Sequence, residues 1–491
     1  MRLRILLLLF TVIVPVNAFS SDASLSITLR EAISMAVEKN LDVRAELYNS
    51  AMYEADIKRY QSIYDPVLAL QASYTDSSTA TFSSAGMPFS TQSIVLNSSI
   101  SQLLWTGGTA ALSFNNGYTD SSAVTGWQTG LGVSLTQPLL KNVGREATEI
   151  AIHTARSAKF SSLEHFNSRL LNTVAQVRTE YFKLHSLREE LDVKKVSLEL
   201  AQKILSDTNA RVKAGVLPAM EVLNAEYGAA TRERELIDAE RAVRDQVDIL
   251  RLLIQADSAV SELKTIDLPS RERTDIVETE AVKMALNRPD IREQKQNIEL
   301  YALQTRNLNQ KTRPDLNFTA SAQLTGLDSA YQRNLDKIFT YDYPIWMVGI
   351  ELKYPLGNGA AENEYRRSRL KAEQASLQLR SLEESSVNEV RSAIRAVDSG
   401  FKLIEVADRG KSFAEERLRA FTRKNEVGLA TTKEVLDVEN ELAISKSNQI
   451  KAVVGYSNAL TRYWQVTGEL LEKEGIRVVE GDADKLYSAS R

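Results

Sequence analysis

The chain has 491 residues, and its hydrophobic fraction of 43% is ordinary for a protein that folds around an apolar core. Its formal net charge of -4 is too small to indicate a nucleic-acid-binding protein, and losing Arg2 and Arg4 with a leader would change it only to -6. The absence of cysteine excludes disulfides, thiolate metal sites and an N-terminal cysteine lipid anchor.

The first residues have the pattern of a secretory signal peptide. Arg2 and Arg4 precede a largely apolar run at 5–14, and small residues follow at 16–18. We predict cleavage after about Ala18, with a buried first helix as the alternative. Beyond residue 20, no apolar run approaches the roughly 20 residues that a membrane-spanning helix needs. The mature protein is therefore expected to leave the cytoplasm without a transmembrane helix.

The chain contains an internal duplication. Residues 31–74 align with 280–322, and the segment GVLPAMEVLNAE at 215–226 aligns with GLATTKEVLDVE at 428–439. A repeat of this size indicates two equivalent structural halves. The predicted division is a signal peptide (1–18), a first repeat (19–256), a linker (257–276), a second repeat (277–471) and a C-terminal tail (472–491).

Long helices dominate both halves. The stretch 146–213 lacks proline and glycine, and apolar residues recur in it every seven positions: Leu163, Leu170, Val177, Leu184, Leu191, Leu198, Leu205 and Val212. The second half repeats the design over 362–425, and shorter returning helices are predicted at about 218–256 and 431–471. A strict heptad repeat predicts coiled-coil packing, with a first helix on the order of 100 Å long.

Segments with period-two alternation lie between the helices, at about 67–138 and 315–355. Apolar residues alternate there with serine, threonine, glycine and asparagine, and aromatic residues are frequent. This pattern is typical of transmembrane barrel strands, although a soluble sheet with one wet face alternates in the same way. The signal peptide and the long helices favour the membrane. One chain has about four to six such strands, which is too few to close a barrel, so several copies must pool them.

No constellation of residues indicates catalysis. The three histidines, His153, His165 and His185, are spaced about 18 and 30 Å apart along one predicted helix and cannot share a metal. GKS at 410–412 lacks the other features of a phosphate-binding loop. We therefore predict no enzyme activity and no cofactor.

Glycine turns separate each long helix from its returning helix. Gly215 and Gly428 lie where left-handed backbone is expected, in turns at 214–219 and 427–432. Glu434 lies three residues after Thr431, which is capping-box spacing. Asp437 lies one helical turn further on. Capping or solvation therefore remains one interpretation of these acids.

Together these features make the chain resemble the TolC family of outer-membrane channel-tunnel proteins. The resemblance rests on the duplicated EA-x-x-MA helix start, the segments QPLL (137–140) and YPLG (354–357), and the doubled glycine turn followed by E-V-L. It implies a mixed α+β membrane protein, in which a homotrimer forms one 12-stranded β-barrel from two strand pairs per chain. Long helices would continue the barrel as a coiled-coil tunnel across the periplasm. Residues 67–138 exceed residues 315–355 by 31, so an extra hairpin or a long outer loop is expected in the first half.

The resemblance also implies functional residues. Glu434 and Asp437, with Glu221 from the other half, would form a carboxylate ring at the periplasmic gate; this is the second interpretation of these acids. The tips that would dock a periplasmic adaptor protein consist of two turns: Gly215, Val216, Leu217, Val427, Gly428 and Leu429.

The expected function is export of small toxic compounds or secreted polypeptides, in a tripartite efflux or type I secretion system energised by an inner-membrane transporter. The alternative is a secreted coiled-coil structural or adhesive protein without a pore. It explains the heptads but not the duplicated strand pairs.

Overall fold

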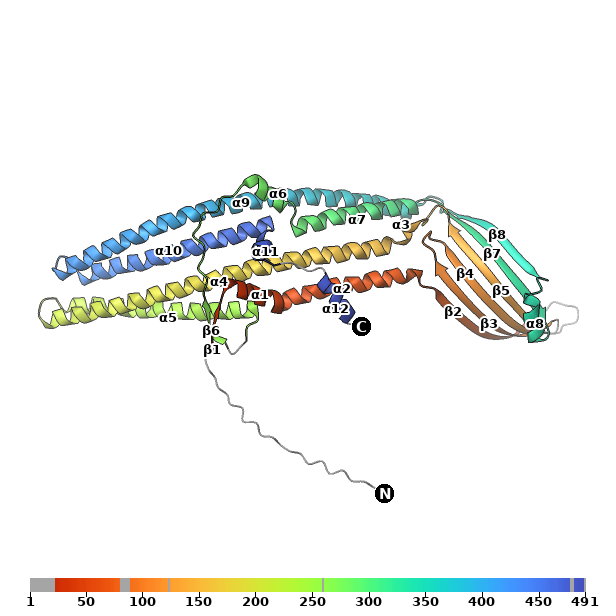
Figure 1. The fold of residues 1–491 in the computed structure, drawn as a ribbon, viewed down its shortest axis with the longest axis horizontal. Helices are drawn as coiled ribbons and strands as arrows, with labels where there is room; N and C mark the ends of the chain where they lie inside the picture. The colour runs from red at the N-terminus through yellow and green to blue at the C-terminus, as the bar shows by residue number, and fades with distance from the viewer. Residues whose placement is uncertain (1–22, 80–88, 122–123, 258–259, 477–480, 490–491) are drawn as a thin grey trace, which may run out of the picture. The chain divides into compact units, whose positions relative to one another are not determined.

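The computed structural model describes residues 23–79, 89–121, 124–257, 260–476 and 481–489. The expected signal peptide at 1–18 lies outside these residues. The chain forms two compact units, and two long helices, α4 (Ile150–Lys213) and α9 (Gly359–Glu426), contribute a segment to each (Figure 1). The first unit takes the chain up to Arg44, Leu170–Ala281 and Glu389–Ile476; the second takes Ala45–Arg169, Val282–Asn388 and the chain after Ile476.

The first unit is helical apart from one pair of short parallel strands. Besides its parts of α4 and α9, it contains β1 (Ala23–Ile27), α1 (Leu29–Lys39), α5 (Met220–Ile254), β6 (Val260–Thr265), the first half of α6 (Glu278–Ala285), α10 (Thr432–Thr467) and α11 (Leu470–Lys473).

Heptad positions of α4 form part of the core of the first unit. Leu170, Val177 and Leu184 are at most 2% exposed, whereas the heptad positions nearer the end of α4 are half-buried. The Tyr181 hydroxyl donates to the carbonyl of Ile27 at 2.9 Å and accepts from the N–H of Ile266 at 3.0 Å. Because these partners flank the paired strands, one buried side chain of α4 holds β1 and β6 in place.

The second unit contains helices and one large sheet. It comprises most of α2 (Leu41–Gln61), η1 (Ser62–Tyr64), β2 (Val67–Thr79), β3 (Phe89–Leu103), β4 (Thr109–Ser121), β5 (Thr125–Pro138), α3 (Arg145–Thr148), α7 (Pro289–Lys311), β7 (Asp315–Asp328), α8 (Tyr331–Ile338), β8 (Pro344–Lys353) and α12 (Gly481–Ala489).

The sheet has six strands in the order β2-β3-β4-β5-β7-β8, and every neighbouring pair is antiparallel (Figure 1). Four strands come from the first half of the chain and two from the second. The 31 additional residues of the first half are therefore accommodated by an extra hairpin, β3 and β4, which turns at 104–108. Gly107 has a φ of 85°, a left-handed conformation that glycine adopts cheaply, and an added Cβ would meet the Asn142 carbonyl at 2.5 Å.

The register places apolar and small polar residues on opposite faces of the sheet. Across β2, β3 and β4, Leu68 pairs with Ile100 and Ile100 pairs with Leu112, so these side chains share a face. The same row continues through Val133 on β5 to Trp346 on β8, and neighbouring rows on this face reach Val348 and Ile350. Serine, threonine, glutamine and glycine predominate on the other face. In the part of the chain that the structure describes, no helix has both the length and the apolarity to cross a membrane.

Helix α8 covers one end of the apolar face through a small polar cluster. Asn334 is fully buried and donates to the Thr129 hydroxyl, which donates to Asn116 at 2.8 Å. The Tyr331 ring packs edge-on against Trp127, with ring centroids 4.9 Å apart. The close approach depends on Gly326, where an added Cβ would lie 2.0 Å from the Asn334 carbonyl.

Candidate gate at the helical tips

Two turns with the same hydrogen bonding end the long helices of the first unit. The N–H of Gly215 bonds the carbonyl of Val212, and the N–H of Val216 bonds that of Arg211, both at 2.9 Å. In the second turn, the N–H of Gly428 bonds Asn425 at 3.1 Å and that of Leu429 bonds Lys424 at 2.8 Å. Both patterns are Schellman motifs, and each glycine has a φ of 75°. We call these the tip turns, residues 214–219 and 427–432.

The tip turns line one groove with a volume of about 840 Å³. Its lining includes Arg211 and Glu221 from the first half of the chain and Glu434 from the second. Three apolar side chains of the turns are largely exposed: Val216 (69%), Val427 (69%) and Leu429 (78%). The structure therefore brings together both predicted turns and two of the three predicted acids.

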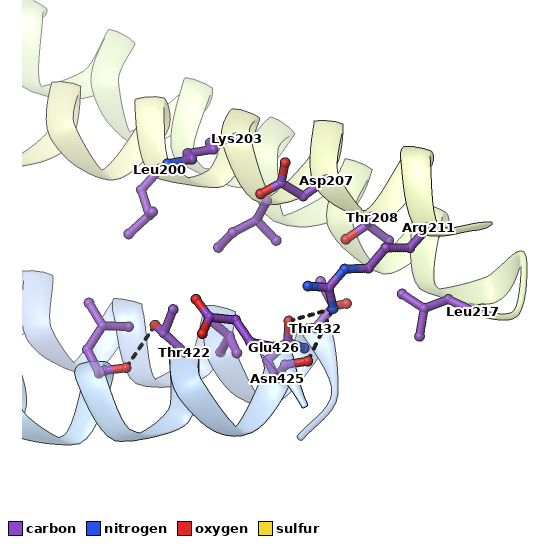
Figure 2. Close-up of a pocket in the computed structure, with 13 residues that line it drawn as sticks. Leu200, Lys203, Asp207, Thr208, Arg211, Leu217, Thr422, Asn425, Glu426 and Thr432 are labelled. Carbon is purple, nitrogen blue, oxygen red and sulfur yellow. Dashed lines mark hydrogen bonds between the residues drawn. The ribbon is translucent and has the colours of Figure 1, made fainter. Parts of the chain in front are cut away.

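Arg211 connects the two tip turns directly. Its Nη1 donates to the backbone carbonyl of Asn425 at 3.1 Å and to the Asn425 side-chain oxygen at 3.4 Å (Figure 2). The Asn425 amide in turn donates to the carbonyl of Ala430 at 2.9 Å, inside the second turn. One arginine of α4 thus holds the end of α9 and, through Asn425, the turn that starts α10.

The tip turns connect α4 to α5 and α9 to α10, which gives two helix pairs. Behind the Arg211–Asn425 contact, α4 of the first pair and α9 of the second are incompletely packed. A cavity of about 220 Å³ lies between them, lined by charged and apolar residues of α4 and α9, among them Lys203, Asp207 and Glu426 (Figure 2). A void of this size means that dispersion contacts between α4 and α9 are sparse near the tips. The returning helices α5 and α10 do pack there, since Leu436 is buried and an added Cβ at Gly228 would lie 2.8 Å from its Cδ1. The Arg211–Asn425 contact consequently contributes a large share of what joins α4 to α9 there.

Glu434 caps α10. Its carboxylate accepts from the Thr431 N–H at 2.7 Å, and the Thr431 hydroxyl accepts from the Glu434 N–H at 3.2 Å. The backbone bond from Thr431, followed by the bond to its hydroxyl, holds the pKa of Glu434 below its usual value. Glu434 is therefore ionised near neutral pH and already engaged within its own helix.

The other two predicted acids differ from Glu434. Asp437 is exposed, and among the described residues it makes no hydrogen bond or ion pair. Glu221 is half-buried, and its Oε2 is buried without a hydrogen-bond partner among those residues. Asp437 does not line the groove, whereas Glu221 does. In a single chain the three carboxylates therefore do not form one cluster.

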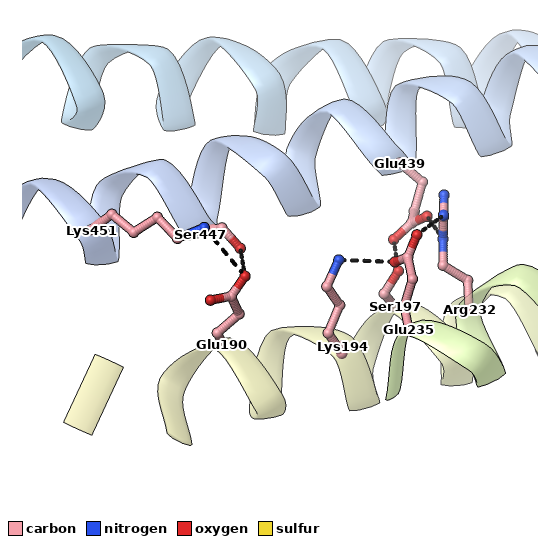
Figure 3. Close-up of polar contacts among 8 residues, drawn as sticks. All are labelled: Glu190, Lys194, Ser197, Arg232, Glu235, Glu439, Ser447 and Lys451. Atoms are coloured by element: carbon pink, nitrogen blue, oxygen red, sulfur yellow. Dashed lines mark hydrogen bonds and ion pairs between the residues drawn. The ribbon is translucent and has the colours of Figure 1, made fainter. Parts of the chain in front are cut away.

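A buried polar cluster joins three helices further from the tips (Figure 3). Glu439 of α10 accepts from the Ser197 hydroxyl of α4 and, at 3.1 Å, from Nε of Arg232 on α5. Arg232 also donates to Glu235 at 3.3 Å, and Glu235 accepts from Lys194 of α4 at 2.9 Å. Arg232 and Glu439 are only 7% and 4% exposed. This cluster connects the first helix pair to the second.

The sequence did not identify four residues that make these contacts: Arg211, Asn425, Arg232 and Glu439. A weak signal exists for Glu439, because the aligned position in the first repeat is Glu226. Arginines on a long helix are otherwise indistinguishable from solvated ones until their partners are known. The Arg211–Asn425 contact spans 214 positions of sequence, so local spacing carries no trace of it.

Comparison with known proteins agrees with this architecture. The sequence matches the family described as "Outer membrane efflux protein" over residues 32–254 and 282–469. Comparison with curated protein sequences finds no significant match.

Solved structures share the fold at low sequence identity. CmeC, an outer membrane channel of Campylobacter jejuni, is 14% identical with a TM-score of 0.68, and the match covers 94% of this chain and 89% of that one. VceC, an outer membrane protein of Vibrio cholerae, is 17% identical with a TM-score of 0.67, covering 90% and 96%. CusC is 14% identical with a TM-score of 0.68, covering 89% and 91%. With the family match spanning most of the sequence, the chain belongs to the outer membrane efflux protein family.

Proposed function

We propose that this protein is the outer-membrane duct of a tripartite system that exports small toxic compounds or secreted polypeptides. Its family places it in the outer membrane, extending into the periplasm, as an efflux channel. In the proposed assembly three copies combine their sheets into a transmembrane barrel, and their long helices form the periplasmic tunnel. The protein is a conduit and not an enzyme, so energy comes from an inner-membrane transporter.

The main structural support for this proposal is the six-stranded sheet, which has one apolar face and one mostly polar face. One face presents large apolar side chains to its surroundings, including Leu70 (74% exposed), Trp346 (78%) and Ile350 (71%). The opposite face is mostly small or polar, with Ile345 and Met347 of β8 among its larger apolar residues. A sheet whose apolar face contacts lipid and whose polar face lines a channel has this distribution. The alternative, a secreted coiled-coil protein without a pore, gives no reason for so much exposed apolar surface.

The tip turns are proposed as the site where a periplasmic adaptor docks. Gly215, Val216 and Leu217 form one turn; Val427, Gly428 and Leu429 form the other. Their exposed apolar side chains, Val216, Val427 and Leu429, are suited to bury against a partner. In the trimer the acids near these turns, Glu221, Glu434 and Asp437, would lie around the periplasmic gate.

Cell fractionation and mass measurement in detergent test the proposed channel. We expect the wild-type protein in the outer-membrane fraction, with a particle mass of three chains after correction for detergent. Planar bilayers that receive the purified protein should show discrete ion conductance. A soluble periplasmic monomer without conductance would exclude the proposed channel and leave the structural coiled-coil alternative.

The proposed role of the acidic residues at the gate is tested by a separate experiment. Asp437→Asn should reduce cation selectivity of the closed channel and weaken block by trivalent cations roughly 10-fold, equivalent to about 1.4 kcal/mol. Asp437 is the cleaner choice because Glu434 also caps its helix. Asp238→Asn is the matched control, since Asp238 is exposed on α5 about 27 Å along the helix from its start. If Asp437→Asn keeps the selectivity and block of the wild type, as Asp238→Asn should, Asp437 has no role at the gate.

A further inference from the structure

The six-stranded sheet is open, and both of its edges are unpaired among the described residues. The edge strands β2 and β8 are 13 and 10 residues long. The side chains described along β2 are exposed, and so are those of β8 except at Gly349, whereas the inner strands β4, β5 and β7 are largely half-buried. Each edge therefore offers a long row of free backbone N–H and C=O groups.

Neither edge carries, along its central stretch, the features that keep natural edge strands from pairing. Proteins protect exposed edges with proline, charged side chains, bulges or very short strands. In β2 the register with β3 is unbroken, and the first charged residue is Asp76, near the strand's outer end. In β8 proline occurs only at the first position, and charges only at Glu351 and Lys353, near its last residue. Both central stretches are available for pairing.

The two edges are also complementary in direction. Six strands that alternate in direction make β2 and β8 antiparallel to each other. If β8 of one copy pairs with β2 of the next, the alternation continues without a break around a closed ring. The apolar rows continue too, because Leu68, Leu70 and Tyr74 of β2 share the face of Trp346, Val348 and Ile350 of β8.

We propose that β2 of each copy pairs with β8 of the next, so that three copies close an 18-stranded barrel. This rests on the proposed trimeric channel, and it differs from the 12 strands that the family resemblance implies. The difference arises from the hairpin β3–β4, which raises the contribution of each chain to six strands. Sheet edges in hydrocarbon must be paired, so all six strands take part in the ring.

A wider exit follows from the larger strand number. Barrel diameter grows roughly linearly with strand number, so 18 strands give a diameter about 1.5 times that of 12. The face that would line this lumen consists largely of small uncharged residues such as Ser73, Ser113 and Ser134, with Glu351 and Lys353 confined to one end. The barrel would select little by charge and would pass bulky cargo, including polypeptide segments.

Disulfide trapping in outer membranes tests the pairing, because the chain has no native cysteine. Ser73→Cys on β2 is combined in turn with Ile345→Cys, Met347→Cys or Gly349→Cys on β8, all on the lumen-facing side. Within one chain these strands are separated by five strand spacings, about 24 Å, which no disulfide spans. After oxidation, at least one combination should give a covalent trimer on a denaturing gel that reductant collapses to monomer.

Two controls use the same chemistry. Ser73→Cys alone should remain monomeric on the gel. Ser73→Cys with Ser134→Cys should also remain monomeric, because Ser134 lies on the central strand β5, where both neighbours are already paired. Cross-linking in either control, or none from any edge combination while the native trimer persists, would overturn the pairing and leave the channel function intact.

The number of strands in the barrel can also be measured directly on the wild-type protein. Electron cryo-microscopy of the detergent-solubilised channel, viewed along the barrel, should resolve 18 strands with threefold symmetry. Twelve strands from three chains would mean that the extra hairpin stays outside the ring, and twelve from two chains would mean a dimer. Either count overturns the inference. A monomer without conductance would instead reject the proposed function itself.

Discussion

Replacing Arg232 with alanine is expected to lower the free energy of unfolding of the first unit by about 3–5 kcal/mol. Arg232 is 7% exposed and donates to Glu439, which is 4% exposed, at 3.1 Å. Without the guanidinium, the Glu439 carboxylate stays buried with the Ser197 hydroxyl as its remaining donor. A buried charge without a compensating partner is costly, and Glu235 loses a donor as well.

The loss is measured from the helical circular dichroism of the detergent-solubilised protein during denaturation. Arg234→Ala is the matched control, because Arg234 is exposed two residues away on the same helix, and it should change stability by less than about 0.5 kcal/mol. Adding Glu439→Gln to Arg232→Ala should restore part of the loss, because it removes the buried charge. Equal effects of Arg232→Ala and Arg234→Ala would show that the cluster contributes little to stability.

Patterns repeated along the chain were sufficient to predict the main elements of each half. A proline- and glycine-free stretch with a seven-residue repeat predicts a long helix, and α4 spans Ile150–Lys213. A glycine after such a stretch predicts a left-handed turn, and Gly215 and Gly428 both adopt one. These features depend on local backbone preferences, which the identities of neighbouring residues determine.

Features that depend on distant partners were not predictable in the same way. The alternation of apolar and polar residues in the first half was compatible with either an extra hairpin or a long outer loop. Serine, threonine and asparagine occur in strands and loops alike, and pairing between β3 and β4 is a tertiary property. The buried cluster is similar: Arg232 meets Glu439 across 207 positions of sequence. Helical periodicity does not distinguish such an arginine from exposed Arg234, because burial is decided by the helices that pack against it.

The role of Glu434 at the start of α10 was predictable only in part. Spacing alone identified Thr431 and Glu434 as a capping box, and both reciprocal bonds are present. The same spacing left open whether Glu434 also acts at a gate. That question concerns neighbouring copies of the chain, since within one chain Glu434 and Asp437 have different surroundings. The assignment of the proposed gate acids therefore depends on measurements on the proposed trimer.

Removing the Arg211 side chain is expected to shift the channel towards its open state. Hydrogen bonds from a charged donor contribute about 1.5–3 kcal/mol, and a cavity of about 220 Å³ leaves few other contacts between α4 and α9 near the tips. Losing about 1.4 kcal/mol in each chain corresponds to a factor of about 10 in the balance between joined and separated tips. Arg211→Ala should therefore raise the open probability in planar bilayers by about 10-fold or more.

Lys213→Ala is the matched control for this change, because it removes a positive charge at the same helix end from an exposed side chain. The open probability of Lys213→Ala should equal that of the wild type. Asn425→Ala removes only the side-chain part of this contact and leaves the backbone carbonyl as an acceptor for Arg211, so it should open the channel less than Arg211→Ala. The double variant should open little more than Arg211→Ala alone. Fully additive effects of the two changes would mean that Arg211 and Asn425 act separately. An Arg211→Ala channel with the open probability of the wild type would show that other contacts hold the tips together.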